Sequence, residues 1–463
     1  MALVAGVDSS TQSCKVLIVD ADSGEVVREG RANHPDGTAV DPRHWWTAFQ
    51  QALEQAGGLR GVEALSVGGQ QHGMVALDHD GEVIRDALLW NDTRSADAAL
   101  QLRAEFTDWA PAVGHVPLAS FTNSKVRWLA DNEPRNAERV AALALPHDWL
   151  TWKIRGSEEL SDLITDRSDA SGTGYFDSVS NEYRRDLLGL CLRRDANEII
   201  LPRVLEPDES VQGPGFIVGP GGGDNAMAAL GMALGAGHAS LSIGTSGVVA
   251  AVAAEPVVDP SGVVNGFADC RGEWLALTAT LNAARVANSV RELLGVDFDE
   301  FSELALSSAP GAGGLTMVPW FEGERTPNLP HATASLMGMT LENFDRANLA
   351  RASVEGMLCL LAGGLQAIRE LGTTIDRVAL IGGGSRSEAV RQLAPSVLGL
   401  PVDVPAAAEY VALGAARQAA WVLTGQLPQW QPEGSRSYDG EPSPNLVSNY
   451  TAISQQLIDS NHW

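Results

Sequence analysis

Positive charge is scarce in this chain, and lysine is almost missing from it. The 463 residues include 32 basic and 58 acidic side chains, a formal net charge of −26, and lysine occurs only at positions 15, 125 and 153. A chain this acidic exerts no long-range attraction on nucleic acid or on an anionic bilayer. We therefore expect a neutral small molecule as its partner, and neither nucleic acid nor membrane.

Cysteine is also rare, and long apolar runs are missing. The four cysteines, at positions 14, 191, 270 and 359, form no Cys-x-x-Cys pair and no Cys/His metal pattern. This usage is typical of a protein kept in the reducing cytoplasm. No uncharged apolar stretch reaches the roughly 18 residues of a membrane span, and the first residues lack the basic and apolar segments of a signal peptide. The sequence thus predicts neither export nor membrane insertion.

A Walker A phosphate loop is missing as well, yet three other loops rich in glycine and hydroxyl groups follow apolar, strand-like runs. They are Asp8–Lys15, Ser242–Gly247 and Ile381–Ser387. Backbone N–H groups at such strand ends can hold phosphate oxygens. If the chain binds ATP, separate loops from two domains must converge on a cleft. Lys15 suits a point contact with phosphate; the alternative is a lysine that survives by chance at a strand edge.

The order of predicted elements favours an α/β fold with two domains built on one plan. Strand, hydroxyl-bearing turn and strand occur at 3–20 and again at 239–252, and a helix pattern over 354–368 leads into a strand at 378–381. Small residues around 235–238 would permit a hinge. We predict an N-terminal domain of residues 1–236 and a C-terminal domain of residues 237–463.

A tight turn presents one carboxylate in the segment Gly219-Pro-Gly-Gly-Gly-Asp-Asn225. Asp224 is expected at the start of a small-residue helix, where it either caps the helix or acts chemically. An enzyme that phosphorylates a hydroxyl group needs one carboxylate to accept the proton of that hydroxyl. Asp224 is therefore the candidate catalytic base.

Two further segments carry groups suited to a polyol. Gln70-Gln-His-Gly73 follows a strand, at the edge where α/β proteins usually bind ligands, and Trp90-Asn-Asp-Thr-Arg94 sets an aromatic ring beside an amide and a carboxylate. The alternatives are that His72 is bonded within its own loop and that residues 90–94 only start a helix. Both interpretations stay open at this point.

With these loops and segments, the chain resembles the FGGY carbohydrate kinases nearly from end to end. Longer stretches typical of that family carry the resemblance beyond the glycine loops. They are Ser120–Asn132, Pro146–Lys153, Thr165–Gly172, Gly323–Pro327, Ala334–Met339 and Asn348–Glu355.

The resemblance implies an actin-like fold, in which two duplicated ribonuclease H-like domains close over a deep cleft, and it implies ATP and Mg²⁺ as cofactors. It places Asp8 near Mg²⁺ and makes Asp224 the catalytic base. The sugar is expected at Gln71, His72, Asp92 and Asn225, the phosphates at Thr11, Lys15, Gly244 and Thr245, and the adenosine at Gly382, Gly383, Gly384 and Ser385.

The implied reaction is phosphorylation of D-xylulose at its 5-hydroxyl, with sugar and ATP as partners and a homodimer as one option for the assembly. Members that act on xylulose commonly have Met where this chain has Gln71. A kinase of another ketose or polyol, such as ribulose, gluconate or glycerol, is therefore the alternative. A different class, an actin-like ATP-binding protein or a sugar sensor without turnover, conflicts with the presence of Asp224 and the Gln-Gln-His-Gly loop.

Overall fold

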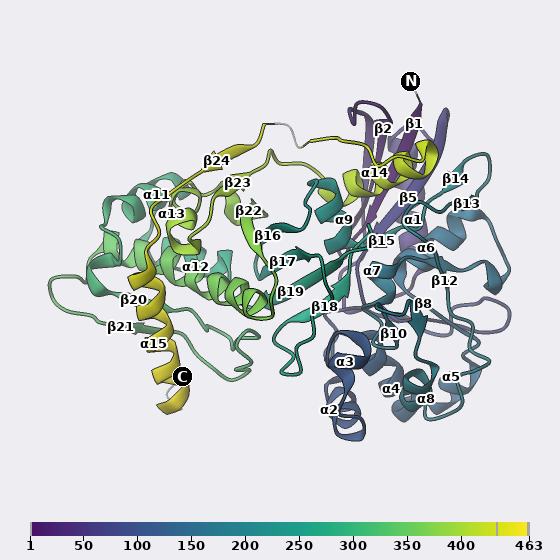
Figure 1. Ribbon diagram of the computed structural model, residues 1–463, viewed down its shortest axis with the longest axis horizontal. Helices are drawn as coiled ribbons and strands as arrows, with labels where there is room; N and C mark the ends of the chain where they lie inside the picture. The colour runs from purple at the N-terminus through teal and green to yellow at the C-terminus, as the bar shows by residue number, and fades with distance from the viewer. Residues whose placement is uncertain (1, 432–433, 461–463) are drawn as a thin grey trace.

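Two lobes, each built on a seven-stranded sheet, lie side by side (Figure 1). The computed structural model describes residues 2–431 and 434–460. The first lobe is drawn in purple and blue, and the second mainly in green. The predicted α/β class is therefore confirmed, and the strand pairs predicted at 3–20 and 239–252 are both present.

The first sheet has the order β13-β14-β5-β1-β2-β3, and β15 also pairs with β5. Strands β1, β2 and β3 form an antiparallel meander, because short polar turns join them. Strand β5 returns parallel to β1 after helix α1. The bounds are β1 Leu3–Ser9, β2 Ser13–Asp20, β3 Val26–Asn33, β5 Val62–Gly69, β13 Val211–Gln212, β14 Ile217–Val218 and β15 Gly222–Gly223.

The second sheet repeats this plan in the order β18-β19-β17-β16-β22-β23-β24. Strands β16, β17 and β19 form the antiparallel part, and β22 lies parallel to β16, as β5 lies parallel to β1. The bounds are β16 Gly237–Ile243, β17 Gly247–Ala253, β18 Asn265–Ala268, β19 Trp274–Thr280, β22 Ile375–Ile381, β23 Val402–Val404 and β24 Arg436–Tyr438. In both sheets the glycine loops start where the central parallel strands end.

Helices cover both sheets. The first lobe has α1 Arg43–Gln55, α2 Ala96–Glu105, α3 Trp109–Val113, α4 Thr122–Asn132, α5 Pro134–Arg139, α6 Pro146–Arg155, α7 Arg167–Ala170, α8 Arg185–Leu192 and α9 Asp224–Gly231. The later helices are α10 Ala284–Leu294, α11 Phe298–Ser307, α12 Arg346–Glu370, α13 Glu388–Leu398, α14 Tyr410–Thr424 and α15 Pro444–Ser460. The helix predicted at 354–368 is thus the central part of α12. This helix is buried along most of its length, because it carries apolar and small residues on all of its sides.

Short strand pairs complete the fold outside the two sheets. They are β4 Ala39–Val40 with β7 Ala87–Leu88, β6 Val75–Leu77 with β8 Ala142–Ala144, β9 Ile164–Thr165 with β12 Arg203–Val204, β10 Phe176–Asp177 with β11 Glu182–Tyr183, and β20 Thr316–Val318 with β21 Ser335–Met337.

Helix α14 belongs to the second half of the sequence but packs on the first lobe (Figure 1). Its backbone touches β1 and α9 directly, because glycines stand at the contacts. A Cβ atom on Gly6 would lie 1.9 Å from the carbonyl oxygen of Ala412, and one on Gly414 would lie 1.9 Å from that of Met227. Real Cβ contacts are never this short, so the helix can dock only with glycine at both positions.

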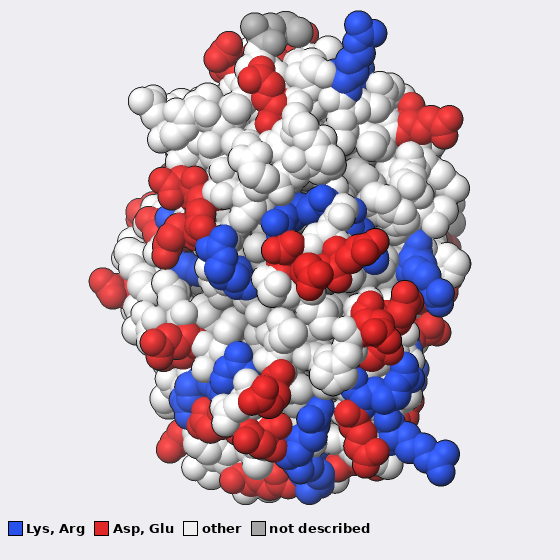
Figure 2. All heavy atoms as spheres, turned by 90° about the vertical axis from the view of Figure 1, so that its right-hand side faces the viewer, with Lys and Arg blue, Asp and Glu red and all other residues white. Residues whose placement is uncertain are grey.

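The structure agrees with the scarcity of basic residues and of long apolar runs in the sequence. On the face of the first lobe that Figure 2 shows, acidic and basic side chains are mixed and form no basic patch. Among the described residues, no helix combines the length and the apolar character that crossing a membrane requires.

The docking of α14 predicts opposite effects for two helix glycines. Gly414→Ala inserts a methyl group into the backbone of α9, so we expect a stability loss of about 1–3 kcal/mol or more. Gly363→Ala is the matched control: it lies on an exposed side of α12 with nothing within 4 Å of the new Cβ, and alanine favours a helix by about 1 kcal/mol over glycine. Thermal melts measure both; a Gly414→Ala protein as stable as wild type would contradict the packing argument.

Candidate active site

The first loop closes on an ion pair at the end of the β1–β2 hairpin. Asp8 and Lys15 are register partners across the two strands, and the Lys15 ammonium lies 3.1 Å from Asp8 Oδ2 and 2.5 Å from Glu409 Oε2. Burial raises the pKa of Asp8, and the nearby Lys15 ammonium lowers it in part. Lys15 is thus held by two carboxylates at the predicted phosphate loop, and its contact with phosphate stays a prediction.

Asp224 stands where the sequence predicted it, as the first residue of α9. Strand β15 pairs in parallel with the end of β5, so Asp224 emerges at the same sheet edge as Gln71. Its Oδ1 accepts hydrogen bonds from the backbone N–H and the side-chain amide of Asn225, at 2.8 and 2.9 Å. Burial, with the Asp8 charge as a second cause, raises the pKa of Asp224 to about 7. The carboxyl group therefore titrates near neutral pH, as a general base should.

A cavity of about 250 Å³ brings Asp224 together with most of the predicted sugar-binding residues. Its walls come from both lobes. It is lined by Thr11, Gln71, His72, Trp90, Ser120, Phe121, Asp224, Asn225, Ser246, Val248, Asn265, Phe267, Leu277, Ala279 and Arg325. The mixture of aromatic rings with a few amide, hydroxyl and charged groups suits a small polar ligand.

His72 offers the cavity a neutral ring. Its Nδ1 lies 3.0 Å from the carbonyl oxygen of Gly172, and a carbonyl can only accept, so Nδ1 carries the proton. Burial holds the pKa of His72 well below its usual value, and the charge of Lys125 lowers it further. The other nitrogen, Nε2, is therefore left as an acceptor. The sequence could not decide between a ligand contact and a contact within the loop; in the structure Nδ1 bonds Gly172, which lies outside the loop at 70–73.

Gln71 lines the cavity but is tied to the protein at both ends of its amide. Its Nε2 donates to the carbonyl oxygen of Ser168 at 3.3 Å, and its Oε1 accepts from Asn225 Nδ2 at 3.3 Å. Residue 71 therefore connects α7 with the residue beside Asp224, and whether it also contacts the sugar stays a prediction.

Asp92 does not line the cavity, unlike the other predicted sugar contacts. Its carboxylate accepts from Thr38 Oγ1 at 2.8 Å and from Arg94 Nε at 2.8 Å. The aromatic residue of the same segment takes the place at the wall: Trp90 lines the cavity and donates from Nε1 to Thr11 Oγ1 at 2.8 Å. This bond joins the first glycine loop to the aromatic wall.

A second cavity, of about 750 Å³, lies between the second and third loops. Gly244, Thr245, Gly383 and Gly384 line it, together with residues of α10, α11 and α13. Gly382 and Ser385 are not among its lining residues; Ser385 Oγ instead donates to the Gly382 carbonyl at 2.8 Å and closes the turn. The volume of this second cavity lies within the range of about 300–1,000 Å³ typical of pockets for small molecules and cofactors.

The second loop separates the two cavities. Gly244 and Thr245 line the larger one, and the next residue, Ser246, lines the smaller one. A group transferred from a ligand in one cavity to a ligand in the other would therefore pass this loop, which borders the cavity that Asp224 lines.

Several lining residues were not predicted from the sequence. Arg325 reaches the small cavity from the second lobe, and its side chain makes one hydrogen bond to the described residues, to Ser120 Oγ at 3.3 Å. In the large cavity, Arg291 stacks on Phe298 with 4.4 Å between the guanidinium carbon and the ring centre. Arg325 lies in the family-like segment 323–327, which could have pointed to it, whereas nothing local marks Arg291 or Phe298.

Comparison with known proteins identifies the family of the chain. The family description "FGGY family of carbohydrate kinases" matches with its N-terminal domain at residues 3–231 and with its C-terminal domain at residues 239–423. The chain belongs to the FGGY carbohydrate kinases. The resemblance seen in the sequence is confirmed.

Named FGGY relatives span almost the whole chain. A xylulose kinase of Streptomyces coelicolor is 43% identical over 444 residues, which are 92% of this chain and 89% of the relative. The crystal structure of xylulose kinase from Bifidobacterium adolescentis is similar with a TM-score of 0.93 and 50% identity, covering 98% of this chain and 99% of that one.

A distant FGGY structure shows the shared fold alone. Glycerol kinase of Plasmodium falciparum with ADP has a TM-score of 0.86 at 18% identity, over 100% of this chain and 98% of that one. The predicted actin-like fold, with two duplicated domains, is thereby confirmed.

The raised pKa of Asp224 predicts a pH-dependent cost in stability. The unfolded carboxyl group titrates near pH 4, whereas the folded one titrates at about 7. Between these values only the folded state holds the proton, so stability falls as the pH rises. We expect Asp224→Asn to melt about 2–4 °C above wild type at pH 8, and this gain to shrink toward pH 4.5. Calorimetry at both pH values is the test, and a gain independent of pH would contradict the assignment.

Proposed function

We propose that this FGGY kinase transfers the γ-phosphoryl group of ATP to the 5-hydroxyl of D-xylulose. One observation carries the proposal: the small cavity lined by Asp224 and the nucleotide-sized cavity lie on either side of a single glycine loop. The xylulose kinases that are 43% and 50% identical to the chain support the choice of sugar.

Sugar binding would use the small cavity. His72 Nε2 accepts a hydrogen bond from one hydroxyl, and the Asn225 amide and the Trp90 ring contact others. The Asp92 carboxylate already bonds Arg94 and Thr38. We therefore propose that Asp92 acts on the sugar only indirectly, through one of these two residues. Closing such a site excludes water, so that the phosphoryl group is not lost to hydrolysis.

Asp224 would act as the general base. As the 5-hydroxyl oxygen bonds to the γ-phosphorus, its proton passes to the Asp224 carboxylate, and the bond from that phosphorus to the β–γ bridging oxygen breaks. The products are sugar 5-phosphate, ADP and a protonated Asp224. A pKa of about 7 leaves enough carboxylate at neutral pH to begin each turnover. The Arg325 guanidinium, at the same cavity, would balance charge on the phosphoryl group as it moves.

The loops would hold the nucleotide in a chain whose net charge of −26 repels it. Thr11, Lys15, Gly244 and Thr245 would bind the phosphates, and the Gly382–Ser385 turn would border the adenosine. Mg²⁺ fits beside Asp8: carboxylate oxygen is its preferred ligand type, and a divalent cation there would relieve the repulsion by which Asp8 raises the pKa of Asp224. When bound, the ion neutralises part of the phosphate charge.

We propose the same two domains, residues 1–236 and 237–463; as they close on the substrates, α14 would move with the first domain. The contact between Arg325 and Ser120 spans the cavity between them, whereas α14 of the later part stays packed on the first lobe. All four cysteines are buried and unpaired, which supports a location in the reducing cytoplasm. The homodimer stays a prediction.

Loss of the base should separate turnover from binding. For Asp224→Ala we expect a fall in kcat of at least about 1,000-fold, because a group that acts only in the transition state is removed. The dissociation constant of xylulose should change little, since His72, Asn225 and Trp90 remain. A coupled ADP-release assay and calorimetric titration give the two quantities. Near-normal turnover would exclude Asp224 as the base.

The choice of sugar is open to a direct test at position 71. Gluconate kinase and glycerol kinase share the fold at 20% and 18% identity, so the architecture alone admits other acceptors. We expect wild type to prefer xylulose over ribulose, gluconate and glycerol in an ADP-release panel at fixed ATP. Gln71→Met should change the ratio of kcat/KM between these sugars by several-fold without abolishing activity. No ADP release with any sugar would instead favour a binding protein without turnover.

A further inference from the structure

The glycine turn before Asp224 is held by side chains from three separate helices. His147 of α6 reaches the Pro220 carbonyl with Nε2 at 3.2 Å. Gln418 of α14 bonds Gly221 twice, accepting from its N–H at 2.8 Å and donating to its carbonyl at 2.9 Å. Ser168 Oγ of α7 accepts from the Gly223 N–H at 3.1 Å. Glycines have no side chains of their own to fix a turn, so these contacts determine where the Asp224 carboxylate lies.

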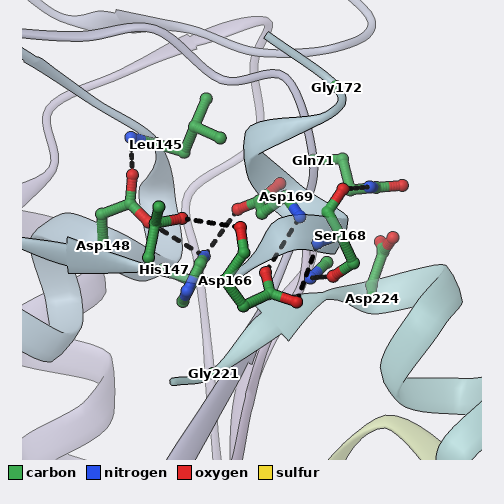
Figure 3. Close-up of polar contacts among 12 residues, drawn as sticks. Gln71, Leu145, His147, Asp148, Asp166, Ser168, Asp169, Gly172, Gly221 and Asp224 are labelled. Atoms are coloured by element: carbon green, nitrogen blue, oxygen red, sulfur yellow. Dashed lines mark hydrogen bonds and ion pairs between the residues drawn. The ribbon is translucent and has the colours of Figure 1, made fainter. Parts of the chain in front are cut away.

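Behind the turn lies a fully buried cluster of charged groups, which Figure 3 shows. His147, Asp148, Asp166 and Asp169 are each 3% exposed or less. His147 Nδ1 lies 2.6 Å from Asp169 Oδ2 and 3.3 Å from Asp148 Oδ1. Asp166 accepts from the backbone N–H groups of Ser168 and Asp169, both at 2.9 Å, and so caps α7.

The contacts of His147 favour a proton on both ring nitrogens. The Pro220 carbonyl can only accept, so Nε2 carries one proton, and Nδ1 points at carboxylates. Burial lowers the pKa of His147, but the Asp148 and Asp169 carboxylates outweigh it and raise the pKa to about 10. Burial raises the pKa of Asp148 and Asp169, and the His147 charge lowers both in part. A buried imidazolium therefore offsets part of the cost of burying these carboxylates.

A metal ion is the other group that one histidine and two carboxylates could hold. The 2.6 Å between His147 Nδ1 and Asp169 Oδ2 is the length of a charge-assisted hydrogen bond. Two ligands of a tetrahedral zinc ion, each about 2.0 Å from the metal, lie roughly 3.3 Å apart. The spacing therefore favours a direct ion pair.

We propose that His147, as an imidazolium paired with Asp169, is a positioning residue for Asp224 and for the sugar-side amide of Gln71. The two paths start from the same cluster. One runs through the Pro220 carbonyl to the glycine turn, and the other through α7, where Ser168 holds Gly223 with its hydroxyl and Gln71 with its carbonyl oxygen. In Figure 3 Ser168 lies between the cluster on one side and Gln71 and Asp224 on the other. The role of Asp224 in this proposal rests on the proposed function.

Three variants test the positioning role. His147→Gln removes the charge and one donor, and a misplaced base then lowers kcat by about 10- to 100-fold. KM for ATP stays within about three-fold, because among the described residues no hydrogen bond joins the cluster to the predicted nucleotide loops. His147→Lys restores a buried cation with three donors and should recover most of kcat. Thr151→Val, on the same helix, is the matched control, since the buried Thr151 hydroxyl has no hydrogen-bond partner among the described residues.

A spectroscopic readout independent of turnover accompanies the kinetics. In NMR spectra of protein labelled with ¹⁵N-histidine, both ring nitrogens of His147 should be protonated, and one of the two N–H protons should resonate far downfield. These signals should be absent from the spectrum of His147→Lys. Wild-type kcat in His147→Gln, or a spectrum with one unprotonated nitrogen, overturns the proposal. A metal site would give a different pair of results: His147→Lys would be inactive, and a chelator would lower the melting temperature of wild type. Both results together overturn the proposal.

Two further results keep the test decisive. If His147→Gln does not fold, Ser168→Ala takes its place, and an unchanged kcat in that variant also overturns the proposal. If wild type does not phosphorylate xylulose, the proposed sugar is wrong, and the same comparison is made with whichever sugar of the panel is turned over.

Discussion

The direct contact of α14 with β1 and α9 is the constraint on which the rest of the site depends. Because Gly6 and Gly414 lack side chains, a helix from the end of the chain can lie against the first sheet at backbone distance. This docking brings Glu409 to Lys15 and Gln418 to Gly221. The two glycines thereby allow one helix to contact both the Asp8–Lys15 loop and the turn that precedes Asp224.

This acidic protein also buries several carboxylates in and around the candidate active site. Asp8 and the Asp148, Asp166 and Asp169 cluster are buried, which is costly for charged groups, and the half-buried Asp224 lines the small cavity. Lys15 and His147 each offset part of this cost from within. The chain has only three lysines, so few cations are available to pair with buried carboxylates. The pKa of Asp224 stays raised because no cation pairs with this carboxyl group among the described residues.

Local sequence patterns were enough to predict several of the secondary-structure elements of this protein. The strand pairs at 3–20 and 239–252, the helix around 354–368 and the start of a helix at Asp224 follow from hydrophobic period and glycine turns, which act over a few residues, and they are confirmed. Family membership also follows from linear motifs, because those motifs extend over most of the chain. The roles of the individual site residues stay predictions.

What the sequence determined by itself was the set of elements, the two-fold plan and the loops that could hold phosphate, since each depends on neighbours in the chain. Only the tertiary structure decided which side chains share a cavity. In the structure Trp90 and not Asp92 lines the small cavity, Arg325 lines it from the other lobe, and Gln71 is bonded to Ser168. These outcomes depend on contacts between residues tens to hundreds of positions apart, which no local period or propensity encodes.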